Sequence, residues 1–466
     1  MGKNSGLKFS TIVLIGCVFV VLNWLVLKFF APTPVVVQTE QEITQTIKPS
    51  APVVVRGEGY EFTRRGNRIS NIKLEKYLDG GAPVELLGGE NEFIEFGVVG
   101  ADSAITIEPG ENYITRIKVS GTGTPYARIV RGGNGDNTML AAAGGVVNAG
   151  GQIKRESWSG IDAKGTAYDS SAFVGFEDQY WEVVVAPSAP GVARIKEVGK
   201  DKFQADITGS ADYKIYAGAK KQDTLNAAAA EISGINRTMD YGWFSFLSRP
   251  FLWLLTELHK LFGNYGLAII FLTLILRVLM IPLTKKSYKS MAAMQKMQPE
   301  MQRIQKLYAD DKARLQKEMM ALYAKSKANP MSGCLPMLLQ IPIFFALYKA
   351  LIIAVDMRNS DFLWIPDLAS ADPTSIFNLF GLLPFSPPTW LPVIGILPVL
   401  MGLSMWVQQK LSATASASSA VPGMQIMKWL PWIFVIMFAG LPAGLVLYWT
   451  ISNLFGLAQQ QYISRT

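Results

Sequence analysis

The sequence predicts a polytopic α-helical membrane protein of six transmembrane helices, with a large all-β domain outside the cytoplasm and a cytoplasmic helical hairpin. Half of the 466 residues are hydrophobic and only 17% are charged, whereas about 25% of the residues in a soluble domain are charged. The apolar residues gather in runs that approach the length of a membrane span. One long stretch between the first two runs instead alternates apolar and polar residues. These patterns exclude a soluble single domain and a disordered chain.

The first apolar run, residues 9–30, predicts an N-terminal transmembrane anchor over residues 1–30. Its 22 residues can cross roughly 30 Å of hydrocarbon at about 1.5 Å per residue. Residues 14–17 (LIGC) have the pattern of a lipoprotein processing site, but the apolar run continues to Phe30, which favours an uncleaved anchor. Residues 31–56 are rich in Pro, Val, Gln and Thr and predict an extended linker.

Residues 57–240 predict an antiparallel β-sandwich. Short runs such as 127–131 (ARIVR), 180–185 (YWEVVV) and 213–216 (YKIY) alternate apolar and polar residues between Gly, Asn and Asp. A period of two with such boundaries is typical of half-buried strands. Only residues 225–232 have a helical pattern here, and the segment is long enough to bury a core of its own.

Residues 241–466 predict a core of five further membrane helices. An amphipathic stretch at 244–262 is expected to lie on the membrane surface. Candidate spans follow at 265–283, 335–355, 391–407, 424–441 and 444–458, several of them short for a bilayer. Between the first two of these spans, residues 285–330 are polar and strongly helical.

The distribution of charge predicts which side of the membrane each loop occupies. Residues 285–333 hold 11 Lys or Arg and 4 Asp or Glu, a net charge of +7, and the loop 410–428 is also basic. Residues 31–240 hold 22 basic and 27 acidic residues, a net charge of −5. Because Lys and Arg accumulate on the cytoplasmic side, we expect both termini and the hairpin in the cytoplasm and the β-domain outside it.

The most informative single residue is Arg277, which lies inside the apolar run 269–280. A charged residue in a span marks a polar cavity or path unless it snorkels to the surface. Lys285 is eight residues further on, about 12 Å along a helix, which is beyond the reach of one side chain. We therefore favour a hydrated groove around Arg277. Other polar or aromatic residues of the spans are expected to line it, although each also has an ordinary packing role: Thr273, Gln340, Tyr448, Trp449 and Ser452.

The segment 285–330 predicts two antiparallel helices that form a short coiled-coil hairpin, with a turn at residues 310–311. Met294, Met297 and Met301 follow the heptad spacing of an apolar stripe. Such a stripe is more often plain core than a peptide-binding surface. The basic residues of the hairpin, among them Lys296 and Arg303, could attract anionic lipid or ribosomal RNA.

The remaining chemistry-bearing residues point to no enzyme and no cofactor. Lys349 lies near enough to the end of its span to snorkel outward, and His259, the only histidine, is expected to be an interface residue. The sequence contains no phosphate-binding loop, zinc-protease motif or nucleophile elbow. One histidine and two distant cysteines exclude a His-based metal site and a disulfide framework. We predict no catalytic residue and no metal site.

Four segments of the last 226 residues resemble the YidC/Oxa1/Alb3 membrane protein insertases. They are 277–285 (RVLMIPLTK), 318–323 (EMMALY), 329–344 (NPMSGCLPMLLQIPIF) and 441–449 (LPAGLVLYW). They occur in the family's order, and the leading anchor with a large β-domain is similar to the Gram-negative bacterial arrangement. The resemblance covers about residues 241–463.

The resemblance implies a chaperone-like insertase of the inner membrane, with a groove that opens to the cytoplasm and to lipid and contains Arg277. It implies that nascent membrane proteins are the substrates, that the protein works alone or with the Sec translocon, and that the hairpin contacts the ribosome and the signal recognition particle or its receptor. It also implies a periplasmic β-domain with a sugar-mutarotase-like supersandwich fold. Residues 31–240 contain no histidine, so we expect that domain to be non-catalytic.

Two other functions stay open on the sequence. A transporter or channel for a small solute would have paired broken helices in two related halves, and we find no internal repeat. A membrane-anchored periplasmic sugar-binding protein would have a polar, aromatic-lined pocket within residues 57–240.

Overall fold

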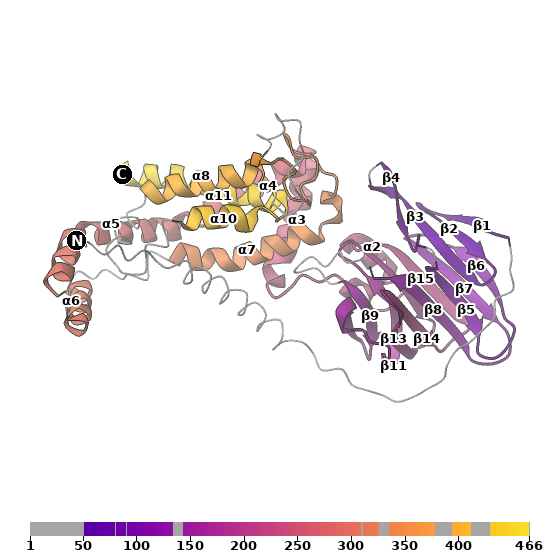
Figure 1. Cartoon of the computed structure of the whole chain (residues 1–466). Coiled ribbons are helices and arrows are strands. Elements are labelled where there is room, and N and C mark those ends of the chain that lie inside the picture. Colours follow the sequence, from indigo (N-terminus) through magenta and orange to yellow (C-terminus); the bar gives the residue numbers. More distant parts are fainter. Residues whose placement is uncertain are drawn as a thin grey trace.

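The computed structural model describes residues 51–465, apart from positions 80, 90, 134–142, 309–310, 326–334, 378–393 and 412–428. The described residues form two parts that lie end to end, a β-sheet domain and a helical unit (Figure 1). The predicted anchor, residues 1–30, and most of the predicted linker lie outside the described residues.

The described part of the β-domain is one antiparallel sheet of 15 strands. In chain order the strands are Val53–Gly57 (β1), Tyr60–Arg65 (β2), Arg68–Asp79 (β3), Ala82–Leu86 (β4), Phe93–Val98 (β5), Ala104–Pro109 (β6), Ile114–Ser120 (β7), Pro125–Gly132 (β8), Gly144–Ala149 (β9), Gln152–Ser157 (β10), Thr166–Glu177 (β11), Trp181–Pro187 (β12), Gly191–Gly199 (β13), Lys202–Thr208 (β14) and Asp212–Ala219 (β15).

The sheet folds back on itself, as expected for a sandwich. Its strand order is β1-β2-β3-β5-β8-β14-β13-β11-β12-β15-β7-β6, with β4 beside β3 and β9 between β10 and β11. β1 and β6 stand at the two ends of this order and yet contact each other (Figure 1). The β-sandwich prediction is confirmed. The sheet begins at Val53, inside the predicted linker, because the β-branched run 53–55 pairs with β2.

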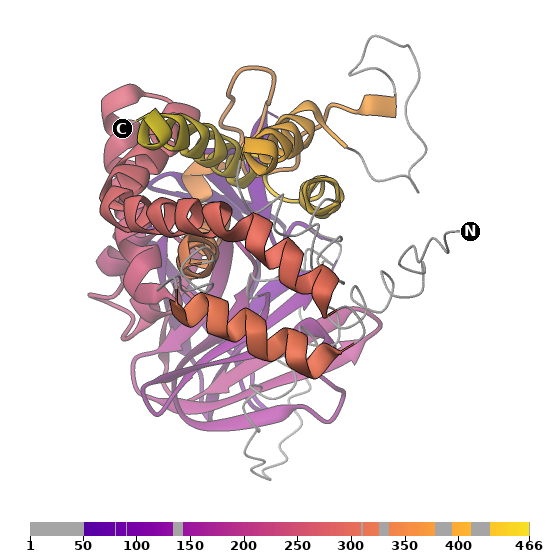
Figure 2. The same cartoon turned by 90° about the vertical axis from the view of Figure 1, so that its left-hand side faces the viewer.

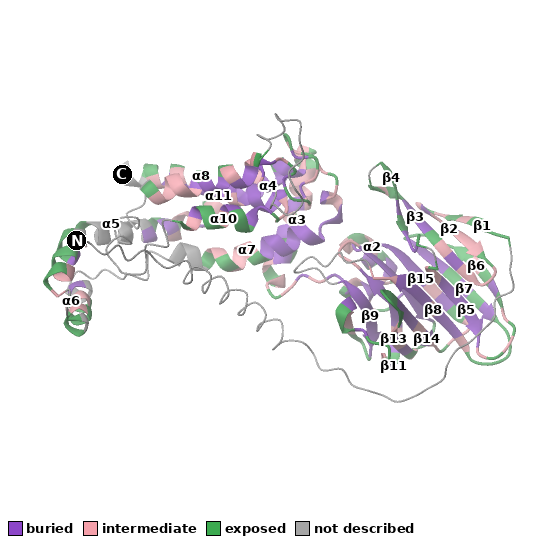
Figure 3. Ribbon diagram, viewed as in Figure 1, coloured by how far each residue is buried: buried purple, intermediate pink, exposed green. Residues whose placement is uncertain are grey.

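Buried aromatic side chains fill the interior of the β-domain. Tyr126, Phe96, Phe173 and Phe176 are all less than 2% exposed, and each contributes about 1.5–3 kcal/mol by leaving water. The strand β12 is buried along its whole length, whereas β7 alternates buried and exposed residues. Figure 3 shows that buried residues dominate the middle of the sheet. A strand covered on both faces, such as β12, is buried at every position. A strand with one face toward water, such as β7, is buried at every second position.

A short helix, Gln222–Ala228 (α2), covers one end of the sheet. Leu225 and Ala228 are fully buried against it. The helix begins three residues before the predicted segment 225–232, and residues 229–232 continue as turns. Ile232 is still buried, so the apolar spacing identified the packed face but not the ends of the helix. The 3-10 turns Trp158–Gly160 (η1) and Ile235–Arg237 (η2) complete the domain.

The described part of the helical unit follows the predicted order. Its elements are Ser245–Phe262 (α3), Tyr265–Leu279 (α4), Ile281–Leu307 (α5), Lys312–Lys325 (α6), Leu335–Ile353 (α7), the 3-10 turn Val355–Met357 (η4), Ile396–Leu411 (α8), Leu430–Phe438 (α10) and Ala443–Arg465 (α11).

Local chemistry explains where α3, α4 and α5 begin and end. Gly263 ends α3 in the left-handed conformation, and the Asn264 side chain caps α4 by accepting from the Leu267 N–H. The predicted span 265–283 is interrupted at Met280. Pro282 has no N–H for an α4 hydrogen bond but fits the first turn of a new helix, so α5 starts at Ile281.

Within the residues that the structure describes, no helix is both long enough and apolar enough to cross a membrane. The six predicted spans therefore stay a prediction, and the first of them lies outside the described residues.

The predicted hairpin is present as α5 and α6, which lie side by side (Figure 2). The chain reverses before α6, where the Asp311 carboxylate accepts from the Arg314 N–H at 3.0 Å and caps the helix. Met301 and Leu322 are buried. The first helix begins at Ile281 rather than Lys285, and residues 326–330 of the predicted hairpin lie outside the described part.

Polar contacts hold the β-domain against the helical unit. Lys349 Nζ on α7 lies 2.7 Å from Asp240 Oδ2, and Gln179 Nε2 donates to the Ile352 carbonyl at 2.7 Å. The expectation that Lys349 snorkels outward is wrong, because its side chain is only 7% exposed and makes this ion pair. Although burial alone would raise the pKa of Asp240, the pairing with Lys349 lowers it below its ordinary value.

Candidate functional site

Three helices bring polar side chains together around Arg277. Arg277 lies on α4, and its Nε donates to Ser452 Oγ on α11 at 2.7 Å. The Gln340 amide on α7 donates to the Tyr448 hydroxyl, one turn before Ser452 on α11. Tyr448 and Ser452 are each 2% exposed, while Arg277 and Gln340 are half-buried. We call these four residues the arginine cluster.

Close approach of α4 and α11 makes this contact possible. Gly444, in the first turn of α11, would place a Cβ 3.0 Å from Ile269 Cδ1 on α4. Gly456, one turn after Ser452, would place a Cβ 2.8 Å from Gln408 Nε2 on α8. The small residues let polar side chains cross between helices, as in helix packing within membranes.

Two residues predicted for the same site have other surroundings. The hydroxyl of Thr273 is fully buried and donates to the Ile269 carbonyl of its own helix at 2.6 Å, so its hydrogen-bonding capacity is used locally. Trp449 packs with Phe344, Phe434 and Phe438, whose ring centroids lie 5.2–5.7 Å from its own. It is part of an aromatic cluster of α7, α10 and α11 rather than a partner of Arg277.

The sequence reasoning missed polar contacts that extend the arginine cluster along α11. Gln459 donates to the Thr284 hydroxyl on α5 at 2.5 Å, and both residues are buried. Asn453 donates to Ser404 on α8 at 3.1 Å. The sequence contains a pattern that indicates this polar face. Tyr448, Ser452 and Gln459 are spaced by four and seven residues, so they share one face of a helix.

Large apolar side chains remain exposed around the outside of the helical unit. On α10, Ile436 is 62% and Met437 46% exposed, and on α4, Val278 is 54% exposed. Figure 3 shows exposed positions along α10 and α7 beside buried ones. Extensive apolar surface of this kind is typical of a membrane or protein contact.

The hairpin residues divide into buried and exposed groups. Met301 is 4% exposed and packs as core, while Met297 is half-buried. Lys296 and Arg303 are exposed. The side chain of Met294 lies outside the described residues. The two basic residues are therefore accessible to a partner, whereas the stripe of methionines is at least partly internal.

A second group of charges is buried at the end of the β-domain nearest the helical unit. Glu177, 1% exposed, pairs with Arg155 at 2.5 Å and with Lys220 at 2.6 Å. Glu182 lies beside them, and its Oε1 accepts from the Thr238 hydroxyl at 3.1 Å. Burial raises the pKa of Glu182 to about 8, even though Lys220 acts in the opposite direction. No three His, Cys, Asp or Glu side chains of the described ranges gather where a metal ion could bind.

Comparison with known protein families covers both parts of the chain. Residues 257–466 match the model of the 60Kd inner membrane protein, and residues 119–254 match that of the YidC periplasmic domain. The chain is 39% identical over 335 residues to a membrane protein insertase YidC of Rickettsia conorii and 40% identical over 336 residues to that of Rickettsia akari. Each match covers 67% of this chain and 59% of the relative.

A solved structure is also similar across nearly the whole chain. It is described as an active YidC insertase crystal structure with the first transmembrane domain resolved. The sequence identity is 20%, the TM-score is 0.40, and the match covers 96% of this chain and 98% of that one. The range that matches the 60Kd inner membrane protein model contains all four segments that carry the resemblance, 277–285, 318–323, 329–344 and 441–449. The chain belongs to the YidC family of membrane protein insertases.

Proposed function

We propose that this protein inserts membrane proteins into the inner membrane and helps them fold, and that the arginine cluster receives the polar tail of the substrate. The observation that carries the proposal is the 2.7 Å hydrogen bond from Arg277 to Ser452, between two helices of largely apolar sequence. The relatives are named insertases rather than enzymes, and we propose no catalytic residue and no cofactor.

The physical step is a reduction in the cost of moving polar groups toward hydrocarbon. A polar tail that enters lipid without partners loses several kcal/mol for each unsatisfied group. The Arg277 guanidinium, the Gln340 amide and the Tyr448 hydroxyl supply donors that replace part of the lost water. The positive charge favours acidic tails in particular. We infer that the apolar segment of the substrate then moves into lipid along α11 and α10.

We propose six membrane spans with a cytoplasmic N-terminus. The exposed apolar side chains of α4, α7 and α10 support contact with lipid. The net charge of +7 over residues 285–333 and of −5 over residues 31–240 supports a cytoplasmic hairpin and a periplasmic β-domain. The amphipathic helix α3 then lies on the periplasmic membrane surface, where Phe246 in its first turn and Trp243, two residues before the helix, are more than two-thirds exposed.

We further propose that α5 and α6 meet substrates and targeting partners before insertion. Exposed Lys296 and Arg303 offer positive charge to the ribosome or to the signal recognition particle and its receptor. We also propose that the protein cooperates with the Sec translocon, and the support for this is the family resemblance alone.

The proposal is tested by replacing Arg277 with Ala or Lys and measuring insertion of a small single-span protein into liposomes that contain the purified chain. Loss of a hydrogen bond to a charged group is worth about 1.5–3 kcal/mol, so Arg277→Ala should reduce insertion at least tenfold. Arg277→Lys should stay partly active, and Arg249→Ala, which removes an exposed arginine of α3, should match the unmodified chain. Full insertion by both Arg277 variants would remove this residue from the mechanism.

A further inference from the structure

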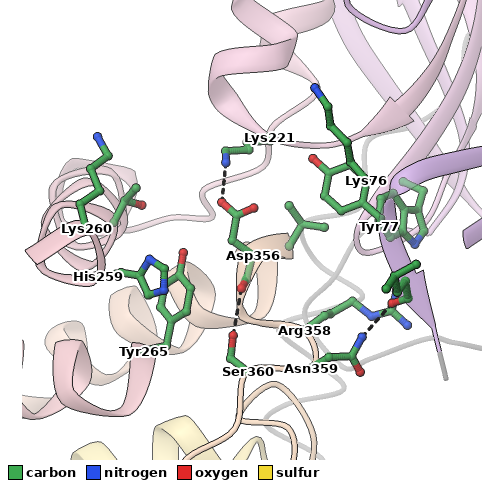
Figure 4. Close-up of a pocket in the computed structure, with 14 residues that line it drawn as sticks. Lys76, Tyr77, Lys221, His259, Lys260, Tyr265, Asp356, Arg358, Asn359 and Ser360 are labelled. Carbon is green, nitrogen blue, oxygen red and sulfur yellow. Dashed lines mark hydrogen bonds and ion pairs between the residues drawn. The ribbon is translucent and has the colours of Figure 1, made fainter. Parts of the chain in front are cut away.

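A cavity of about 570 Å³ lies at the junction between the β-domain and the helical unit. Its walls come from the end of β3, the residue before α2, the last turn of α3 and the segment 355–360 after α7. Figure 4 shows Lys76 and Tyr77 on the sheet side, His259 and Lys260 on the α3 side, and Asp356 between them. The volume lies within the usual range of about 300–1,000 Å³ for small-ligand sites.

The walls of the cavity carry an excess of positive charge. Lys76, Lys221, Lys260, Arg358 and His259 are among the residues that line it, whereas Asp356 is the only carboxylate among them. The charge of Asp356 is already matched, because Lys221 Nζ lies 2.6 Å from its Oδ2 (Figure 4).

The other cations keep capacity for an incoming anion. Lys76 makes no ion pair within the described residues. In the part of the chain that the structure describes, Lys260 pairs only with Glu257 of its own helix. Because 65% of the Lys260 side chain is exposed, this pair contributes little in water. Arg358 lies 3.3 Å from Asp79, which is 67% exposed. The cavity is therefore suited to a negatively charged ligand.

The architecture of the site is fixed independently of any ligand. The rings of His259 and Tyr265 stack with centroids 3.9 Å apart, which joins α3 to α4. Asn359 Nδ2 donates to the Leu78 carbonyl at 2.8 Å, which joins the 355–360 segment to β3 (Figure 4). These contacts hold together the segments of α3, α4, β3 and 355–360 that form the cavity walls.

Exposed apolar residues are close in sequence to the lining residues of α3 and of the segment 355–360. Trp253, one turn before Thr256, is 64% exposed, and Leu261, directly after Lys260, is 73% exposed. Leu363, three residues after Ser360, is 74% exposed. A cationic pocket bordered by apolar side chains matches a ligand that joins a phosphate to hydrocarbon chains.

We propose that this cavity binds the phosphate-bearing headgroup of an anionic phospholipid, with the acyl chains against Trp253, Leu261 and Leu363. The inference rests on the proposed function only in placing α3 at the membrane surface. Bound lipid would contact β3, α3 and the 355–360 segment together and so stabilise the seating of the β-domain on the membrane.

The test measures binding of phosphatidylglycerol and phosphatidylcholine to the purified full chain in detergent, by native mass spectrometry. We expect a clear preference for phosphatidylglycerol. The double variant Lys76→Gln/Lys260→Gln should weaken its binding about tenfold or more, since each lysine near an anionic lipid surface contributes substantially. Lys76→Arg/Lys260→Arg should retain binding. The matched control Lys164→Gln/Lys200→Gln removes two exposed lysines that do not line the cavity and should have no effect.

Each other outcome contradicts the proposal. Equal binding of the two lipids, or equal loss in the Lys164/Lys200 control, would exclude a specific headgroup site. Displacement of the lipid by millimolar glycerol phosphate would identify a site for a soluble phosphate instead. Arg277→Ala should keep normal lipid binding, so failure of the insertion proposal and failure of the lipid proposal give different results.

Discussion

Raising the pH from 5 to 8 should destabilise the β-domain, because Glu182 must then ionise inside the sheet. Its side chain is fully buried on β12, beside the Glu177 carboxylate and with Lys220 and Arg155 nearby. One oxygen accepts from Thr238, and the other has no hydrogen-bond partner among the described residues. The neutral carboxyl suits this environment better than the charged form does.

The size of the effect follows from the two pKa values. The pKa of Glu182 is about 8 in the folded protein, against 4.5 for an ordinary glutamate. Between these values the folded state holds a proton that the unfolded state releases, so the free energy of unfolding falls by about 1.4 kcal/mol per pH unit. The stability is fully present below pH 4.5 and is lost as the pH rises through 8. From pH 5 to 8 we expect a loss on the order of 4 kcal/mol.

The assay is urea unfolding of the full chain in detergent at pH 5, 6.5 and 8, with pulse proteolysis and detection of peptides from β12 and β15. The variant Glu182→Gln cannot ionise, so its stability should vary little with pH and exceed that of the unmodified chain at pH 8. The control Glu75→Gln changes an exposed glutamate of β3 and should keep the unmodified pH profile. Stability that rises between pH 5 and 8, or a Glu182→Gln profile equal to that of the unmodified chain, would show that ionisation of Glu182 does not control the pH dependence.

Two further predictions concern a close helix contact and an ion pair. A Cβ at Gly266, in the first turn of α4, would lie 2.1 Å from Phe362 Cγ. The variant Gly266→Ala should therefore lose about 1–3 kcal/mol of stability and have a lower Tm in detergent. The control Gly440→Ala, where no atom lies within 4 Å of the new Cβ, should keep the Tm of the unmodified chain. Lys349→Met should cost about 1–2 kcal/mol, since the Asp240 side chain is 37% exposed and water can solvate it once unpaired. Faster hydrogen exchange at residues 238–244 would confirm the loss of that contact, and unchanged exchange there would contradict it.

Periodicity predicted the elements of this fold more accurately than their ends. The runs 213–216 and 180–185 identify β15 and β12, although β12 is buried on both faces rather than on one. The ends depend on single residues, such as Pro282, which divides the predicted span 265–283 into α4 and the start of α5. The fold-back of the sheet, with β1 beside β6, is a long-range contact and leaves no local pattern.

The sequence predicts a residue of the candidate site where placing that residue in an apolar segment costs free energy. A charged Arg277 in an apolar run requires polar company, and its contact with Ser452 fits that requirement. Trp449 is uncharged and needs no polar partner, and its ring packs against Phe438 instead. Lys349 was misjudged because its partner Asp240 is 109 residues away. Sequence distance alone gives no means to find such a pair.

Site-specific crosslinking from the arginine cluster to a substrate tests most directly whether this cluster receives the polar tail. A photoreactive phenylalanine analogue replaces Tyr448, and a ribosome-stalled single-span membrane protein is offered to the chain in liposomes. We expect a crosslink between position 448 and the polar tail of the nascent chain. The same analogue at Leu454, which is exposed on another face of α11, should give no crosslink to the tail. Absence of a tail crosslink at position 448, or equal crosslinking at both positions, would contradict the claim that the arginine cluster receives the substrate.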